Sequence, residues 1–138
     1  MGMKLSDLLD LFEECTPVML ATVDGDRPSA RPMTLMKVDG ELFMLTQTGT
    51  PKIAQLRANP RCVVHRALSD DRGNGFISLD CTAAEEPDPA ERRRLYTRAA
   101  YAPTYWKSPE DPTFCLLRLV PDGGRVMKPG EDFAAKVE

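Results

Sequence analysis

Histidine is nearly absent from this chain, and its cysteines are few and scattered. The only histidine is His65, and the four cysteines, Cys15, Cys62, Cys81 and Cys115, form no Cys-x-x-Cys pair. A structural zinc site needs four Cys or His ligands, usually in close pairs, so we expect no metal centre. We expect all four cysteines to be reduced, small, buried residues. His65 has no acidic or cysteine partner at ligand spacing and is expected to be a half-exposed strand residue.

The chain also lacks a long apolar run and an excess of charge of one sign. No run approaches the roughly 20 apolar residues that span a bilayer, and the first residues lack the layout of a signal peptide. Eighteen basic and twenty-one acidic residues give a net charge of −3, which offers no general attraction to nucleic acid or membrane. The arginine run at 92–98 matches the dipole of a helix end. We therefore expect a cytoplasmic protein without a nucleic-acid or membrane partner.

The length predicts one domain over residues 1–138 with a single core. Apolar periodicity and turn signals predict a helix at 5–15 with Ser6 as N-cap, strands at 18–23, 27–38 and 41–46, a short helix from 51, strands at 61–68 and 75–84, a helix at 89–100, a strand at 113–120, a turn at 121–124 and a polar tail at 125–138 with little packing power. Tight hairpins with late helices favour a mainly β fold with peripheral helices, a six-stranded antiparallel barrel or split barrel. The strand at 18–23 is apolar on both faces, which predicts cover by a helix or another subunit.

The stretch "TQTGTPK" from Thr46 to Lys52 connects a predicted strand to the short helix. Thr50 is a good N-cap, and Pro51 fits the first helical position because its missing N–H is not needed there. The free N–H groups of the helix start, the hydroxyls of Thr46, Thr48 and Thr50, and the Lys52 ammonium would converge as a small phosphate cradle. Threonine-rich helix starts with a solvated lysine are also common in proteins that bind no anion, so the loop by itself leaves both interpretations open.

The strand at 27–38 carries a proline in its middle. Pro32 cannot donate to a ladder, so it marks an edge or a bulge where backbone groups are free for other partners, such as a ligand. The Asp39-Gly40 hairpin would bring this part of the strand near the cradle. Arg31 could then add a second positive charge, and its fork suits the paired hydrogen bonds of a phosphate.

Three aromatic residues gather after the second long helix, in a proline-rich connection. They are Tyr101, Tyr105 and the only tryptophan, Trp106. Such residues either fill the core or contact a flat ring or a second chain, and the sequence leaves both possibilities open.

Three segments together resemble a known family. They read "LATVDGDRPSARPM", then "DGELFMLTQTGTPKIAQLRANPR", then "YW" before the last strand. The series is similar to the flavin-binding split-barrel proteins related to pyridoxamine phosphate oxidase, in the branch of bacterial general stress proteins. The resemblance covers roughly residues 5–126, is strongest in the Thr-x-x-x-Thr-Pro-Lys loop and the following Asn-Pro-Arg, and is weak in the C-terminal tail.

The resemblance implies a homodimer with two FMN sites at the subunit interface. The FMN phosphate would be held by Arg31, Lys52 and the region of Thr48 and Thr50. The flavin ring would lie along Pro32, Met33 and Thr34, with Thr46 and Gln47 below it and Trp106 reaching in from the partner subunit.

The C-terminal end departs from the enzymes that oxidise pyridoxamine phosphate. Those enzymes are longer and end in a segment with Arg and His that grips the substrate phosphate, whereas residues 126–130 here carry no such set. We therefore assign no pyridoxamine phosphate oxidase activity. The expected function is an FMN-dependent oxidoreductase with NADH or NADPH as electron donor, an unknown acceptor and unknown catalytic residues. The alternatives are a flavin-binding or stress-related protein without turnover, or a relative that binds a deazaflavin or haem, for which His65 is the only histidine.

Overall fold

The computed structural model describes residues 3–137. Its elements are α1 (Leu5–Leu9), β1 (Cys15–Asp24), β2 (Arg27–Val38), β3 (Glu41–Gln47), α2 (Pro51–Ala58), β4 (Arg61–Asp70), β5 (Gly73–Glu85), α3 (Pro89–Arg98), α4 (Ala102–Tyr105), β6 (Phe114–Met127) and β7 (Ala135–Val137). No helix among these residues is long and apolar enough to cross a membrane.

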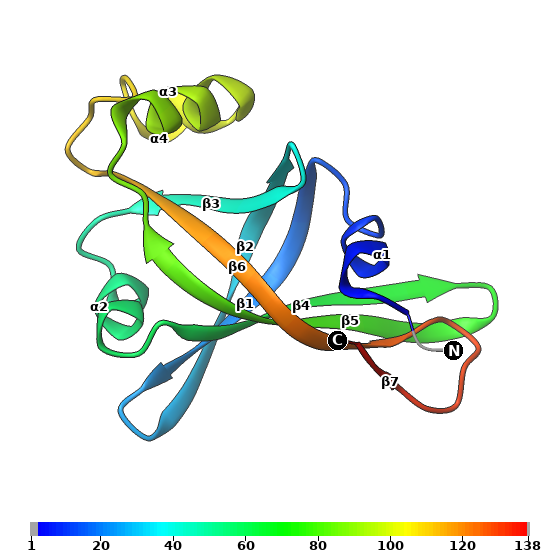
Figure 1. Cartoon of the computed structure of the whole chain (residues 1–138). Helices are drawn as coiled ribbons and strands as arrows, with labels where there is room; N and C mark the ends of the chain where they lie inside the picture. The colour runs from blue at the N-terminus through cyan, green and yellow to red at the C-terminus, as the bar shows by residue number, and fades with distance from the viewer. Residues whose placement is uncertain (1–2, 138) are drawn as a thin grey trace.

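Six of the strands close into an antiparallel barrel. The strand order is β3-β2-β1-β4-β5-β6, and a further pairing of β3 with β6 joins the two ends (Figure 1). Two seams are short: β1 pairs with β4 only over Met19–Ala21, and β2 pairs with β3 only over Met36–Val38. The predicted six-stranded split barrel is therefore confirmed, and the short seams are where it is split.

The interior of the barrel follows from strict alternation along the strands. On β1, Thr16, Val18, Leu20 and Thr22 are buried, while the residues between them are half-buried or exposed. Side chains two residues apart share one face of a strand, so this pattern turns one face of β1 inward. The inward side chains join residues of β4, β5 and β6 in one core, and Leu8 and Phe12 from the N-terminal segment also pack against it.

A second apolar cluster lies outside the barrel, where α3 and α4 cover β3 (Figure 1). Phe43, Leu95, Trp106 and Phe114 are among its buried members. Strand β3 is consequently buried on both faces from Leu42 to Thr46. Helix α3 begins as its sequence predicts, with Asp88 accepting a hydrogen bond from the backbone N–H of Ala90.

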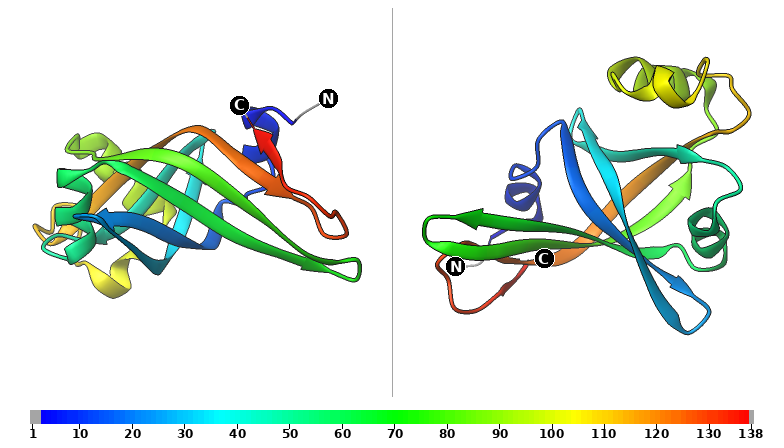
Figure 2. Two further views of the ribbon diagram at one scale, coloured as in Figure 1. Left: turned by 90° about the horizontal axis from the view of Figure 1, so that it is seen from below. Right: turned by 180° about the vertical axis from the view of Figure 1, so that it is seen from behind.

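The outward face of β1 has no such cover. Met19 is 39% exposed, and the views of Figure 2 show no helix over the middle of β1. Helices α3 and α4 reach only the end of β2, where Met36 and Val38 are buried with them. The outward residues of the two strands carry no charge: Pro17, Met19, Ala21 and Val23 on β1, and Pro28, Ala30, Pro32 and Thr34 on β2. Of the two kinds of cover that the sequence predicts for this wall, helices of the same chain cover only the end of β2 among residues 3–137, and cover by another subunit stays a prediction.

The C-terminal segment differs from the predicted polar tail. Strand β6 runs on to Met127, and β7 pairs with it, so that Val126 and Val137 are buried in the barrel core. The predicted turn at 121–124 lies inside β6, where the register shifts between Asp80 and Cys81 of β5. Gly124 permits this pairing because a Cβ there would collide with the carbonyl oxygen of Ser78.

The first helix is shorter than predicted and begins elsewhere. It spans Leu5–Leu9 with Lys4, not Ser6, at the N-cap. The amides of Leu11 and Phe12 donate to carbonyls three residues back, a tighter turn that leads the chain toward β1. Lys37 Nζ donates to the Leu9 carbonyl and so satisfies one of the exposed groups at the helix end.

The cysteines are free thiols, as expected, but one is not buried. Cys62, Cys81 and Cys115 are buried, whereas Cys15 at the start of β1 is exposed. Its outward position on the uncovered face of β1 explains the difference.

Candidate functional site

A cavity beside β2, β3, α2 and α4 has the size of a cofactor site. Its volume is about 730 Å³, within the range of about 300–1,000 Å³ typical of small-molecule pockets. It joins the middle of β2, the end of β3, the start of α2 and the aromatic residues around α4. The lining residues are Pro17, Pro32, Met33, Thr34, Leu45, Thr46, Gln47, Thr50, Lys52, Tyr101, Tyr105 and Trp106.

Eight of the ten residues predicted for the site line this cavity. They are Pro32, Met33, Thr34, Thr46, Gln47, Thr50, Lys52 and Trp106. Arg31 and Thr48 are not among the lining residues. The thiol- and histidine-bearing residues also lie outside the lining, and the described chain holds no cluster of three potential metal ligands.

The start of α2 presents an unneutralised helix end to the cavity. Thr50 takes the extended N-cap conformation and Pro51 the first helical position, and the first turn holds no acidic residue. The Thr50 hydroxyl donates to the carbonyl of Gln47 at 3.0 Å, so its side chain does not cap the helix amides. The partial positive charge of the helix start is therefore left for another acceptor.

Lys52 projects from this first turn as a cation with only a neutral partner. Its Nζ donates to the Thr50 hydroxyl at 3.3 Å, and the side chain is half-buried. Burial lowers the pKa of Lys52, the charge of Arg31 lowers it further, and Cys115 acts weakly in the opposite direction. Arg31 donates to Gln55, which follows Lys52 by three residues on α2, so the two cations lie on the same side of this helix.

Arg31 is held from inside the chain. Its Nη1 donates to the Leu20 carbonyl at 3.1 Å and to the Thr22 hydroxyl at 2.9 Å. Its Nη2 donates to the Ser29 hydroxyl at 2.9 Å and to Gln55 Oε1 at 3.1 Å. These four bonds match the four N–H groups of the two nitrogens, so the expected paired hydrogen bonds from Arg31 to a phosphate do not fit this arrangement. Every partner is neutral, and desolvation lowers the pKa of Arg31.

Thr48 points away from the cavity. Its hydroxyl donates to the carbonyl of Pro112 at 3.3 Å, and its amide donates to the carbonyl of Thr113. It lines a different, smaller cavity together with Glu85 and Arg92. The Thr48 side chain ties the loop to the segment before β6 instead of joining the cradle.

Trp106 lines the cavity of its own chain. It is 3% exposed, and its ring lies 5.0 Å from that of Phe114. Trp106 thus belongs to the cavity wall of its own chain, and a contribution of Trp106 from a partner subunit stays a prediction. The indole Nε1 of Trp106 and the hydroxyl of Tyr101 are buried without a hydrogen-bond partner in the described chain. Two polar groups in the cavity wall are thus left unsatisfied.

Sequence reasoning missed four lining residues of the cavity. Tyr101 and Tyr105 were recognised as aromatic neighbours of Trp106 but not placed in the site, and Pro17 and Leu45 were not singled out. The alternation along β1 is a signal that could have found Pro17, since it puts this residue on the same outward face as Met19.

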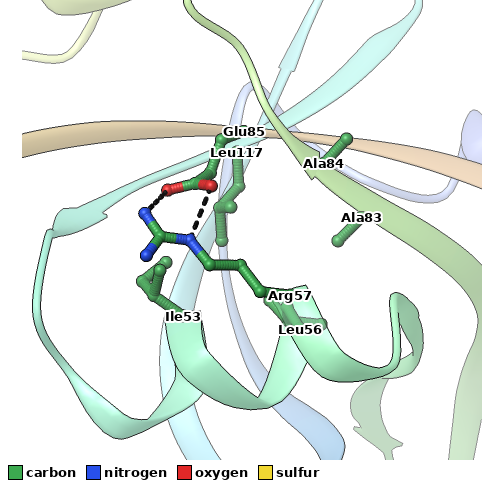
Figure 3. Close-up of a pocket in the computed structure, with 7 residues that line it drawn as sticks. All are labelled: Ile53, Leu56, Arg57, Ala83, Ala84, Glu85 and Leu117. Atoms are coloured by element: carbon green, nitrogen blue, oxygen red, sulfur yellow. Dashed lines mark hydrogen bonds and ion pairs between the residues drawn. The ribbon is translucent and has the colours of Figure 1, made fainter.

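A second cavity, beneath α2, is too small for a cofactor. Its volume is about 230 Å³, and Ile53, Leu56 and Leu117 line it, with the Arg57–Glu85 ion pair beside it at 2.7 Å (Figure 3). Aliphatic side chains from α2 and the barrel wall make up most of the lining, so the cavity is a packing gap under an exposed ion pair.

The closed antiparallel barrel with a cofactor-sized pocket in its wall defines a small split-barrel protein. Residues 6–128 match the sequence model of the family described as pyridoxamine 5'-phosphate oxidase. The match spans most of the sequence, so the chain belongs to this family, as the sequence motifs predict. A search of curated protein sequences finds no match.

Solved structures share the fold at low sequence identity. General stress protein 26 from Bacillus anthracis is 21% identical with a TM-score of 0.74, over 97% of this chain and 99% of that one. A putative pyridoxamine 5'-phosphate oxidase from Listeria innocua is 23% identical with a TM-score of 0.71, over 90% and 98%. A heme binding protein from Mycobacterium smegmatis is 16% identical with a TM-score of 0.74, over 99% of this chain and 58% of that one. These similarities support the barrel fold.

Proposed function

We propose that this chain is a homodimeric FMN-binding protein and a flavin-dependent oxidoreductase. The observation that carries the proposal is the pair Arg31 and Lys52, two neighbouring half-buried cations whose described partners are all neutral. Two like charges in partly desolvated surroundings destabilise the empty protein. A phosphate at the start of α2 would offset that cost, with Lys52 as the direct donor and Arg31 acting through its charge.

The rest of the cavity suits a flat ring. Away from the start of α2, its wall is formed mainly by apolar and aromatic side chains, with Thr34, Thr46 and Gln47 between them. Strand β2 pairs with β3 only from Met36 onward, so the β3-facing edge near Pro32–Leu35 is open to a ligand. Trp106 Nε1 and the Tyr101 hydroxyl are unsatisfied groups in the same wall. A ring with heteroatoms on its rim could satisfy such groups.

FMN, once bound, would supply electron transfer between NADH or NADPH and an acceptor. The residues of the chain bind the phosphate, orient the ring and exclude water around it. Among residues 3–137, no carboxylate, histidine or cysteine lines the cavity, so we assign no side chain as acid or base. Pyridoxamine phosphate oxidase activity is not part of the proposal, because residues 126–130 contain no arginine or histidine.

A second subunit would cover the uncharged outer face of β1 and β2. Met19, Ala21 and Pro32 lie on this face, and Pro32 also lines the cavity. Contiguous apolar surface of this kind marks interaction sites in soluble proteins. The homodimer would thus close the cavity on its open side.

Titration of the purified protein with FMN, followed by quenching of flavin fluorescence, tests the binding. Stopped-flow mixing of the FMN-loaded protein with NADH or NADPH then tests turnover. Binding with fast loss of the oxidised flavin absorbance supports the oxidoreductase. Binding without reduction supports the flavin-binding protein without turnover, and unquenched FMN contradicts the proposal.

The haem alternative draws support from the fold shared with the heme binding protein of Mycobacterium smegmatis. The position of His65 argues against it, because this residue stacks on Phe76 at 5.4 Å and does not line the cavity. An absorption spectrum of the protein distinguishes the three cofactors, since haem gives a Soret band and flavins and deazaflavins differ in their visible bands.

A further inference from the structure

Three polar side chains from three elements form a closed hydrogen-bonded set beside the proposed phosphate site. Thr22 on β1 donates from its hydroxyl to Gln55 Oε1 at 2.6 Å, and Arg31 on β2 donates to both, at 2.9 Å to Thr22 and 3.1 Å to Gln55. Thr22 is 3% exposed and Gln55, on α2, is half-buried. The set connects the barrel wall to the helix whose start holds Lys52.

We propose that Thr22 and Gln55 are positioning residues that hold the Arg31 charge beside Lys52 without neutralising it, and so make the site select a phosphorylated flavin over riboflavin. This inference rests on the proposed function, because it names what sets the specificity of the same site.

The first requirement of the proposal is that the side chain of Gln55 carries no charge. Its Oε1 accepts from both Thr22 and Arg31, so it fixes the guanidinium as a carboxylate would but adds no negative charge. A glutamate of the same length would pair with Arg31 and cancel its field at the phosphate. The amide therefore keeps the positive charge of Arg31 available.

Position on the helix is the second property. Gln55 follows Lys52 by three residues on α2, so the two side chains lie on the same side of the helix. One face of α2 thus carries both the proposed phosphate donor and the residue that holds Arg31. The lowering of the Lys52 pKa by the charge of Arg31 agrees with this proximity.

Selectivity follows because only one of the two flavins carries the charge that the cations attract. FMN and riboflavin share the ring and the ribityl chain, and riboflavin has no phosphate. A change in the Arg31 field should therefore alter the affinity for FMN and leave that for riboflavin nearly unchanged.

The test compares dissociation constants for FMN and riboflavin in four variants of the full chain. Gln55→Glu should weaken FMN binding about tenfold or more and riboflavin binding by less than about twofold. It should also flatten the dependence of FMN affinity on salt, because one uncompensated cation is lost. Thr22→Val should lower the FMN to riboflavin preference, and Thr22→Ser, which keeps the hydroxyl, should retain it.

Thr16→Val is the matched control. Thr16 is 2% exposed on the same face of β1, and its hydroxyl bonds only to the backbone of Glu13. A structural effect of losing a buried threonine would appear there too, without a change in flavin preference. Thermal unfolding of each variant reports whether it folds.

The outcomes separate the inference from the proposed function. If wild type prefers FMN but Gln55→Glu weakens both flavins equally, or neither, the positioning role is wrong while FMN binding stands. If wild type binds neither flavin, the proposed function fails and the inference fails with it.

Discussion

At the scale of single residues, the site is distinguished by two positively charged side chains that form no ion pair with a carboxylate in the described chain. Arg31 and Lys52 have neutral partners, while most other described arginines lie in ion pairs, such as Arg57 with Glu85 and Arg98 with Glu14. Exposed pairs of that kind contribute little to stability. Arg92 also bonds only to neutral groups, the carbonyls of Phe114, Pro109 and Asp111, but it does not line the cavity of Lys52. The position of Arg31 and Lys52 at that cavity, together with their lack of an acidic partner, is what supports the proposed binding of an anion there.

Replacement of Lys52 by alanine should weaken FMN binding by about 1–3 kcal/mol, because a charged hydrogen bond to phosphate is lost. Lys107→Ala is the control, since Lys107 is exposed and outside the cavity lining. Calorimetric titration measures both. Equal affinities in wild type and Lys52→Ala would show that the phosphate lies elsewhere.

The affinity for FMN should begin to fall at a lower pH than it would if Lys52 had the pKa of an ordinary lysine. Burial and the neighbouring Arg31 lower the pKa of Lys52, and only its protonated form can hold a phosphate. The phosphate itself stays a dianion above its second pKa of about 6, so it adds no change on the alkaline side. Fluorescence titrations across pH should show this loss, and Lys52→Arg should shift it to higher pH. A flat profile in wild type would contradict the assignment.

Tyr101 should make the protein sensitive to alkali. Burial first, then Cys15 and Tyr105, raises the pKa of Tyr101 to about 12, above its ordinary value of about 10. The folded chain therefore keeps a proton that the unfolded chain releases, and this stability is full below about pH 10 and is lost as pH rises through about 12.

The variant Tyr101→Phe should lose this part of the alkaline dependence. It should also raise the free energy of unfolding at neutral pH by about 1 kcal/mol, because it removes a buried hydroxyl without a described partner. Urea denaturation at several pH values measures both effects. An identical dependence on pH in wild type and variant would refute the assignment.

At the scale of elements, the sequence predicts best those features of a helix or strand that depend on a single local signal. The Thr50-Pro51 pair predicts the start of α2, and alternation predicts which face of β2 each residue takes. The partners of Arg31 lie on β1 and α2, and those of Thr48 lie just before β6, so sequence spacing alone could not predict either orientation.

The burial of Trp106 could not be predicted from the sequence either. Its sequence neighbourhood is compatible with core packing and with contact to a second chain. Its burial against Phe114 depends on how α3 and α4 fold back onto β3, which involves residues far apart in the chain.

Strand β7 is hard to predict from the sequence because the residues around it are polar, but it should contribute to stability. Val137 is 1% exposed, although the segment around it is polar. Val137→Asp should lower the free energy of unfolding by more than about 2 kcal/mol, because it buries a charge without a partner. Lys136→Asp, at an exposed position on the same strand, should change it by less than about 0.5 kcal/mol. Comparable losses in the two variants, by urea denaturation, would mean that β7 does not dock.

At the scale of the whole molecule, helices cover one side of the barrel, and another side is exposed to solvent. Helices α3 and α4 cover β3, whereas the outer face of β1 and β2 exposes uncharged residues next to the cavity. The apolar character of both faces of β1 predicts that this strand needs cover, but it does not predict whether a helix or a second chain supplies it.

A charge on this face should therefore break the proposed homodimer. Met19→Asp should convert a dimeric wild type into monomers, because an interface would have to bury an unpaired carboxylate. Asp26→Lys, in the exposed turn between β1 and β2, is the control and should remain dimeric. Light scattering after size-exclusion chromatography measures the mass. A wild type that is monomeric at all concentrations would refute the dimer.

The central claim is that two uncompensated cations, Lys52 at the start of α2 and Arg31 on β2, recognise the phosphate of a flavin. The most direct measurement is a calorimetric titration of the purified chain with FMN and, separately, with riboflavin. We predict one FMN per chain, bound about tenfold or more tightly than riboflavin. Equal affinities for the two flavins, or no heat and no quenching with FMN, would contradict the claim.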